Sequence, residues 1–126
     1  MALIDTAKRE KEGSQKLPTR YYSKKQEDAV AKKFGGERVK NSGATKFAPG
    51  DVLTDQFLLE CKTKMSDSES ITINKSWLEK IKKEALFAGK PYQALLFNFG
   101  PNQPNYAIIE ETLFQELIDF LNKNCM

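Results

Sequence analysis

Two acidic residues and a lysine lie close together in the segment GDVLTDQFLLECKTK, residues 50–64. Side chains alternate across a β-strand, so Glu60 and Lys62 share one face if the second half of this segment is a strand. A hairpin that turns around residues 54–56 brings Asp51 close to Glu60. Two carboxylates so placed repel one another unless one takes a proton or a cation lies between them.

This pair of carboxylates predicts a divalent-metal site. Hard oxygen ligands favour Mg²⁺ or Mn²⁺, which keep several waters and can hold a phosphate. A metal lowers the pKa of its bound water and stabilises the charge that builds on phosphate oxygens. Lys62 is then placed to orient the attacking water or to neutralise the transition state. Mg²⁺ is therefore the expected cofactor, with Mn²⁺ as a substitute, and no small-molecule cofactor is expected.

Periodicity and turn residues place these groups in an α/β domain. Three helices are expected, at 24–34 with Ser23 as N-cap, at 75–88 and at 111–122. Five strands are expected at 37–40, 51–53, 57–62, 93–99 and 106–109. The order α-β-β-β-α-β-β-α predicts a mixed central β-sheet flanked by α-helices. Cys61 is expected to be a small buried hydrophobe on the face opposite the acids.

The chain of 126 residues predicts one domain with a terminal extension. Residues 1–19 are polar and charged and predict a basic, flexible arm, so a single folded domain is expected to cover residues 20–126. Residues 1–46 carry twelve Lys and Arg against six Asp and Glu, whereas the remainder carries eight against eleven. A basic first third suits a polyanion such as nucleic acid, although a solvated lysine-rich tail explains the same bias.

The rest of the composition bears on location and on metal chemistry. No apolar run approaches the roughly 20 residues of a membrane-spanning helix, and the first residues lack the apolar core of a signal peptide. Cys61 and Cys125 are the only cysteines, there is no CxxC motif, and histidine is absent. This composition predicts a cytoplasmic protein without a membrane partner and argues against a structural zinc site.

The sequence Glu60-Cys61-Lys62, preceded by Asp51, resembles the PD-(D/E)xK nuclease motif. Within that superfamily the chain is most similar to Holliday junction resolvases of the archaeal and phage kinds, over roughly residues 20 to 100 of the chain. The likeness also draws on a helix acid at Glu27, on the basic strand Arg38-Val39-Lys40 and on Ser42-Gly43 in the following loop.

The resemblance implies a restriction-endonuclease-like core and a Mg²⁺-dependent endonuclease that cuts DNA, with four-way junctions as the favoured substrate. It implies that Asp51 and Glu60 hold the metal with Glu27 as a third acid, and that Lys62 is catalytic. Gly50 stands where the motif has proline, since Pro49 comes one residue earlier. This core also serves restriction enzymes, nickases and exonucleases, so the substrate is the more open part of the interpretation.

Basic and small residues around the motif are candidate contacts to DNA phosphates. They are Arg20, Lys24, Lys25, Arg38, Lys40, Ser42, Gly43, Lys46 and Lys75. Symmetric nicking of two strands requires two active sites, which predicts a homodimer. The apolar faces of residues 106–109 and of the last helix are candidate contact surfaces, unless they only close the core of the monomer.

Each proposed site residue also has a structural explanation. Asp51 suits a turn after Pro-Gly, Glu60 suits an edge strand, and Glu27 suits the first turns of a helix. Lys62 can simply form a salt bridge with Glu60. For the whole chain, one alternative is a nuclease or nickase of the same chemistry that acts on duplex, flap or foreign DNA. The other is a non-catalytic basic DNA-binding module whose acids are structural.

Overall fold

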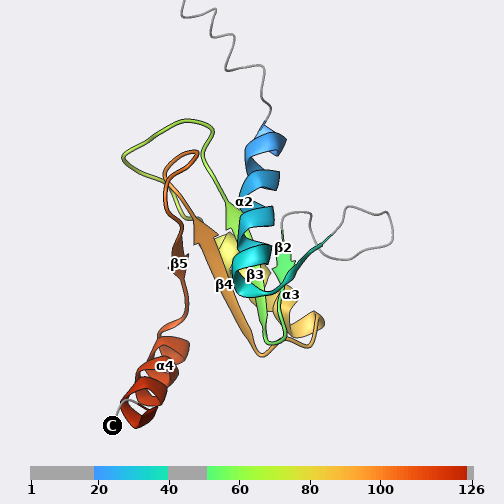
Figure 1. The fold of residues 1–126 in the computed structure, drawn as a ribbon. Coiled ribbons are helices and arrows are strands. Elements are labelled where there is room, and N and C mark those ends of the chain that lie inside the picture. Colours follow the sequence, from blue (N-terminus) through green and yellow to red (C-terminus); the bar gives the residue numbers. More distant parts are fainter. Residues whose placement is uncertain (1–18, 40–50, 125–126) are drawn as a thin grey trace, which may run out of the picture.

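The helices and strands follow the order expected from the sequence. The computed structural model describes residues 19–39 and 51–124 (Figure 1). The helices are α2 (Thr19–Phe34), α3 (Lys75–Phe87) and α4 (Glu111–Asn124), and the strands are β1 (Glu37–Arg38), β2 (Asp51–Leu53), β3 (Phe57–Lys62), β4 (Tyr92–Phe97) and β5 (Tyr106–Ile108). The prediction of an α/β chain with a mixed sheet and flanking helices is confirmed.

The five strands form one sheet in the order β1-β2-β3-β4-β5. Strands β3 and β4 are parallel, and the other neighbours are antiparallel. Parallel neighbours need a crossover connection, which α3 supplies. Strands β2 and β3 form the expected hairpin, and Thr54 closes its turn. The Thr54 N–H donates to the Phe57 carbonyl at 3.0 Å, and Thr54 Oγ1 accepts from the Phe57 N–H at 3.0 Å.

Alternate residues of β3 pack on opposite sides of the sheet. Leu59 and Cys61 pack on one side with Val30 of α2, whereas Leu58 packs on the other side with Ile81 of α3. Figure 1 shows α2 in front of the sheet and α3 behind it. The buried position expected for Cys61 is confirmed. The two helices therefore create two separate environments, and the side chains of Glu60 and Lys62 belong to the side of α3.

Helix α2 begins earlier than the sequence indicated. Thr19 is already helical, and Ser23, which was expected as the N-cap, lies inside the helix. Pro18 directly precedes Thr19 in the sequence, and proline suits the first turn of a helix, so a start at this point competes with Ser23. Residues 1–18, which make up nearly all of the predicted arm, lie outside the described part of the chain.

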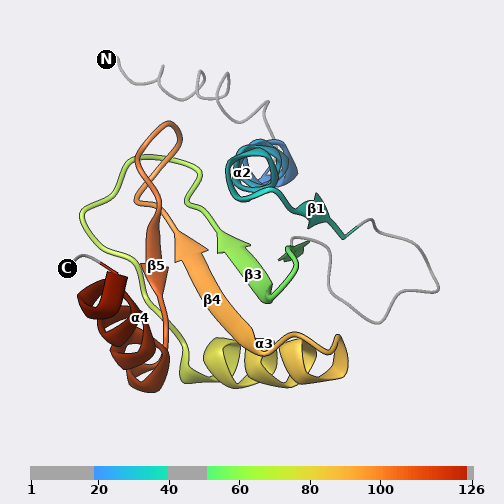
Figure 2. The same ribbon diagram turned by 60° about the horizontal axis from the view of Figure 1, so that its bottom comes forward.

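Helix α4 lies at the sheet edge formed by β5 and extends away from the body of the molecule (Figures 1 and 2). Only Leu113 of this helix is buried. A hydrogen bond from Tyr92 Oη to Glu116 Oε1, at 3.2 Å, joins α4 to the start of β4. None of the helices within residues 19–39 and 51–124 is long and apolar enough to cross a membrane.

Candidate metal centre

The β2–β3 hairpin places two carboxylates side by side. Asp51 is the register partner of Glu60, and directly paired residues of antiparallel strands point to the same face. This face is the one covered by α3, because Leu58 on the same side packs against that helix. Asp51 is 0% exposed and Glu60 is 6% exposed. The structure therefore brings Asp51 and Glu60 together in a buried position.

A third carboxylate comes from α3. Oxygens of Asp51, Glu60 and Glu84 all lie within 4.8 Å of one another. Ile81 and Ala85 anchor this helix on the sheet, and Glu84 lies next to them on the helix surface. Sequence reasoning missed Glu84. The sequence feature that could have indicated Glu84 is an acid beside the apolar face of a predicted helix, because a charge in that position needs a partner.

These carboxylates are short of partners. Both side-chain oxygens of Asp51, together with Oε1 of Glu60 and Oε1 of Glu84, are buried without a hydrogen-bond donor among the described residues. Burial raises the pKa of Asp51 above its ordinary value of 3.8, and the neighbouring Glu60 raises this pKa further. Buried carboxylates are costly unless a proton or a cation compensates them, and Asp51 is the member of this cluster for which neither oxygen has a partner among the described residues.

The geometry of the three carboxylates fits a divalent cation. The ligands of octahedral Mg²⁺ lie ~2.1 Å from the ion, which places them about 3 to 4 Å from each other. One carboxylate oxygen from each of Asp51, Glu60 and Glu84 lies within 4.8 Å of the others, which is close to this spacing. All the donors are hard oxygens, a set that favours Mg²⁺ or Mn²⁺ over Zn²⁺.

Two ammonium groups flank the carboxylates. Lys62 Nζ lies 3.4 Å from Glu60 Oε2 and 4.5 Å from the centroid of the Trp77 ring. Lys80 Nζ lies 2.8 Å from Glu84 Oε2. Burial disfavours the charged form of Lys80, but the neighbouring carboxylates outweigh burial and raise the pKa of this lysine. The salt bridge between Lys62 and Glu60, which would explain this lysine without catalysis, is therefore present. The same contact holds an amine beside the acids.

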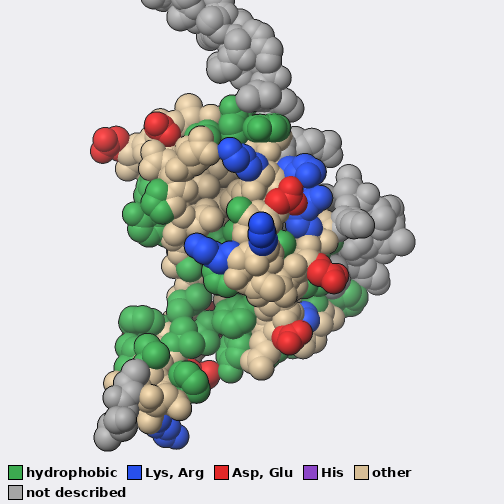
Figure 3. Space-filling model, in the orientation of Figure 1, with side chains coloured by type: hydrophobic (Ala, Val, Ile, Leu, Met, Phe, Trp, Pro, Cys, Tyr) green, Lys and Arg blue, Asp and Glu red, His purple; other side chains and the backbone are tan. Residues whose placement is uncertain are grey.

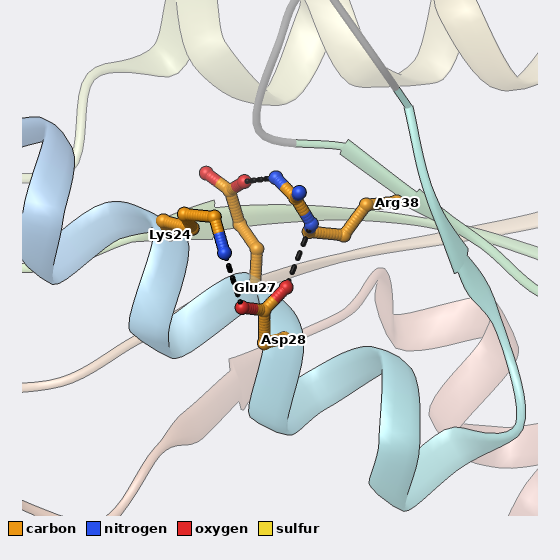
Figure 4. Close-up of polar contacts among 4 residues, drawn as sticks. All are labelled: Lys24, Glu27, Asp28 and Arg38. Carbon is orange, nitrogen blue, oxygen red and sulfur yellow. Dashed lines mark hydrogen bonds and ion pairs between the residues drawn. The ribbon is translucent and has the colours of Figure 1, made fainter.

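Glu27 belongs to a different cluster. It lies on α2, and its Oε1 accepts a hydrogen bond from Arg38 Nη1 at 3.3 Å (Figure 4). Burial raises the pKa of Glu27, while the hydrogen bond from Arg38 lowers it. Arg38 Nε also lies 2.7 Å from Asp28 Oδ1. The group of converging carboxylates draws its third member from α3, so the structure does not bring Glu27 into that group.

The candidate phosphate contacts are dispersed, and several already have polar partners. The pairs are Lys24 with Asp28 at 3.0 Å, Lys25 with Asn102 at 3.0 Å and Lys75 with Glu79 at 3.7 Å. Arg38 is held between two acids of α2. Arg20 lies in the first turn of α2. Lys40, Ser42, Gly43 and Lys46 lie outside the described residues.

A hollow of about 590 Å³ adjoins Lys62. It is lined by Lys62 at the end of β3, by residues 63–68 and 71–72 of the following segment, and by Trp77 near the start of α3. Lys62 and Lys64 supply amines to this hollow, and Ser66 and Ser68 supply hydroxyls. Amines and hydroxyls are among the groups that contact DNA phosphates, and the acid Asp67 is a further member of this lining.

Comparisons with protein-family models, with curated proteins and with solved structures find no match to this chain.

Proposed function

We propose that this protein is a metal-dependent endonuclease that hydrolyses phosphodiester bonds of DNA, built on a restriction-endonuclease-like core. One observation carries the proposal. Asp51, Glu60 and Glu84 come from three elements and bring carboxylate oxygens within 4.8 Å of one another, both oxygens of Asp51 are buried without a donor, and Lys62 lies beside Glu60. Buried carboxylate oxygens without a donor destabilise a fold unless a proton or a cation compensates them, which supports a metal ion at this place.

In this proposal Asp51, Glu60 and Glu84 hold Mg²⁺ or Mn²⁺, and Glu84 takes the place that the resemblance gives to Glu27. The bound ion would lower the pKa of a coordinated water and offset the charge of the phosphate. Glu60 and the Trp77 ring restrict the Lys62 amine, which then orients the attacking water or stabilises negative charge on the phosphoryl oxygens. The hollow beside Lys62 holds the DNA backbone.

We further propose that the substrate is branched DNA, a four-way junction, and that the protein acts in the cytosol in DNA recombination and repair. The resemblance of the Asp51 to Lys62 segment and the basic first third of the chain support this substrate. The test is a substrate panel in which the protein meets a synthetic four-way junction and a linear duplex, each with Mg²⁺ and with EDTA. Mg²⁺-dependent cleavage of the junction is the expected result.

The other results of the panel separate the alternatives. Equal cleavage of junction and duplex removes the resolvase assignment and keeps the nuclease. Cleavage of neither DNA, together with unchanged junction binding by Glu60→Ala, leaves the basic DNA-binding module in which the acids are structural.

The metal site has its own test, because Glu84 was assigned from the structure. Glu84→Gln should lower Mn²⁺ affinity at least tenfold by calorimetric titration and should abolish most cleavage. Glu79→Gln is the matched control, since Glu79 lies on the same helix, is exposed and pairs with Lys75. Equal Mn²⁺ affinity of the two variants would remove Glu84 from the site.

A further inference from the structure

A small pocket lies between α2 and the loop that joins β4 to β5. Its volume is about 170 Å³. One wall is a single face of α2, because its members lie three or four residues apart on the helix: Tyr22, Lys25, Gln26 and Ala29. The other walls are Thr63 directly after β3, Asn98 directly after β4, and residues 101–103 and 105 of the loop. We call this cavity the amide pocket.

Carboxamides supply most of the polar groups of the amide pocket. They belong to Gln26, Asn98, Asn102, Gln103 and Asn105. No acid is among the lining residues in the part of the chain that the structure describes, so the pocket does not select a cation. A carboxamide offers a hydrogen-bond donor and an acceptor side by side. The lining therefore suits a neutral ligand that carries N–H and C=O groups next to each other.

Hydrogen bonds hold part of this lining in place without a ligand. Gln26 Nε2 donates to the Lys62 carbonyl at 2.9 Å and to Asn105 Oδ1 at 3.0 Å. Asn98 Nδ2 donates to the same Asn105 oxygen at 3.2 Å, and Asn98 Oδ1 accepts from Thr63 Oγ1 at 2.7 Å. Gln26 Oε1 is left buried without a donor among the described residues. Such an acceptor is rare in folded proteins, and a ligand N–H is a group that satisfies it.

The size and the apolar groups of the amide pocket suit one flat ring. A protein cavity of about 150 Å³ takes up benzene, which is a single six-membered ring. Tyr22, Ala29 and Pro101 add apolar surface to the lining, and aromatic side chains are the surfaces on which unpaired bases stack. A pyrimidine base combines a ring of this size with an edge of N–H and C=O groups. Both properties of the pocket therefore match a pyrimidine.

The amide pocket adjoins the hollow beside Lys62, since Thr63 lines both. Both cavities lie at the carboxyl ends of β3 and β4, the parallel pair, where open α/β sheets bind ligands. The Lys62 amine lines the hollow, and the Lys62 carbonyl accepts from Gln26 of the pocket. Figure 3 shows Lys and Arg side chains gathered over α2, which attract a polyanion to this side of the sheet.

We propose that the amide pocket binds an unpaired pyrimidine base of the DNA strand whose backbone lies in the hollow beside Lys62. The inference rests on the proposed nuclease function, because it takes the same DNA as its ligand. Tyr22 stacks on the base, and the Asn105 amide and the Gln26 acceptor are the groups left to hydrogen-bond its edge. An unpaired base costs least to turn out of the stack, so the pocket favours branched DNA over intact duplex.

The test compares two four-way junctions that differ in one nucleotide beside the branch point. One carries an unpaired thymine there, and the other carries an abasic residue. The affinity of the full chain for each is measured by fluorescence anisotropy in EDTA, so cleavage plays no part. The thymine junction should bind about tenfold more tightly, which is the effect typical of one stacked base. Equal affinities overturn the proposal, and an unpaired adenine that binds as tightly as thymine overturns the assignment to a single ring.

Ala29→Leu should abolish the preference for thymine. Ala29 is exposed and lines the pocket, so a larger side chain fills space there without removing a hydrogen bond. Ala107→Leu is the matched control, because Ala107 is exposed on β5 and does not line the pocket. Tyr22→Leu, which removes the stacking ring, should also reduce the preference. The readout is a ratio of two affinities of the same protein, so a general change in DNA binding cancels. A full preference in Ala29→Leu overturns the proposal.

The two proposals fail in different ways. A chain that binds neither junction removes DNA as the ligand and overturns both. A chain that cleaves with Mg²⁺ but binds both junctions equally keeps the nuclease and overturns the pocket. A chain that prefers the thymine junction but does not cleave keeps the pocket and overturns the nuclease. Full competition by free thymidine monophosphate at the concentration of the junction would identify a free nucleotide as the ligand and overturn the assignment to a DNA strand.

Discussion

At the scale of single residues, the main feature is the burial of Asp51 next to two other acids. Its carboxylate is fully buried and has no donor, and its pKa is raised by burial and by Glu60. A raised pKa means that the folded chain binds a proton at Asp51 more tightly than the unfolded chain. This contribution to stability is therefore present in full below pH 4 and is lost as the pH rises.

Asp51→Asn should stabilise the metal-free protein at neutral pH, because the amide carries no charge and can donate to a neighbouring carboxylate. We expect the free energy of unfolding in EDTA to rise by about 1–3 kcal/mol at pH 8 and to change less at pH 5. Urea denaturation at both pH values checks this. Asp55→Asn in the exposed hairpin turn is the control and should have no such pH-dependent effect.

In the presence of a divalent metal, the unmodified chain should become more stable than the Asp51→Asn variant. Mn²⁺ that binds the folded chain alone raises its stability by mass action, and it should raise the melting temperature of the unmodified chain far more than that of Asp51→Asn. Thermal denaturation with and without Mn²⁺ measures the shift. Equal shifts for the two proteins would show that Asp51 is not a ligand.

Lys62→Met should separate catalysis from metal binding. The cleavage rate should fall by roughly 10²–10³-fold, the loss typical when one group that stabilises transition-state charge is removed. Mn²⁺ affinity should be kept or slightly increased, because a positive charge 3.4 Å from Glu60 is removed. Lys64→Met is the control from the same hollow. If both variants cleave at the same rate, Lys62 has no special role.

At the scale of elements, the sequence predicted the hairpin better than the helices that pack on it. Pairing of Asp51 with Glu60 follows from a strand period of two and a short turn, both of which are local properties. Glu84 lies on α3, the helix that follows β3 in the chain. Which turn of α3 lies over the hairpin is decided by tertiary packing, here by that of Ile81, and local sequence patterns do not reveal it. The sequence did not predict the early start of α2, because by local chemistry alone Ser23 is as good a starting point for a helix as the position after Pro18.

Gly36 lies between α2 and β1, where the chain passes close to β2. A substitution at this position tests how tightly α2 and the sheet pack together. A Cβ atom at this position would meet the Leu53 carbonyl oxygen at 2.7 Å and Val52 Cγ1 at 2.9 Å. The backbone carbonyl cannot move without shifting β2, so Gly36→Ala should destabilise the fold by about 1–3 kcal/mol in urea denaturation. A loss below about 0.5 kcal/mol, the range of ordinary surface substitutions, would mean that this contact is looser than described.

At the scale of the whole molecule, the basic charge and the acidic cluster lie on different sides of the sheet. Most of the described cations of the first third belong to α2, whereas Asp51, Glu60 and Glu84 face α3. Lys24, Lys25 and Arg38 are already engaged by side chains of the same chain. Lys32 and Lys33, in the last turn of α2, are exposed and make no ion pair among the described residues. Their charges are therefore available to contact DNA phosphates.

Lys32→Gln with Lys33→Gln should therefore weaken metal-free binding to a four-way junction. Each lost phosphate contact lowers the slope of log affinity against log salt by about 0.9, so the slope should fall by about 1–2. Filter binding at several salt concentrations measures it. Lys82→Gln with Lys83→Gln removes the same charge from α3 and should leave the slope unchanged. An equal effect of both pairs would indicate diffuse attraction without a preferred face.

The contact between Lys62 and Trp77 offers a direct optical signal from the candidate centre. Trp77 is the only tryptophan of the chain, and the Lys62 ammonium lies 4.5 Å from the centre of its ring. A cation so close to an indole perturbs its excited state, so any event that draws this amine toward a phosphate should change the intrinsic fluorescence. A spectrofluorimetric titration could then follow occupancy in the unlabelled protein, with the Lys62→Met chain as the silent reference.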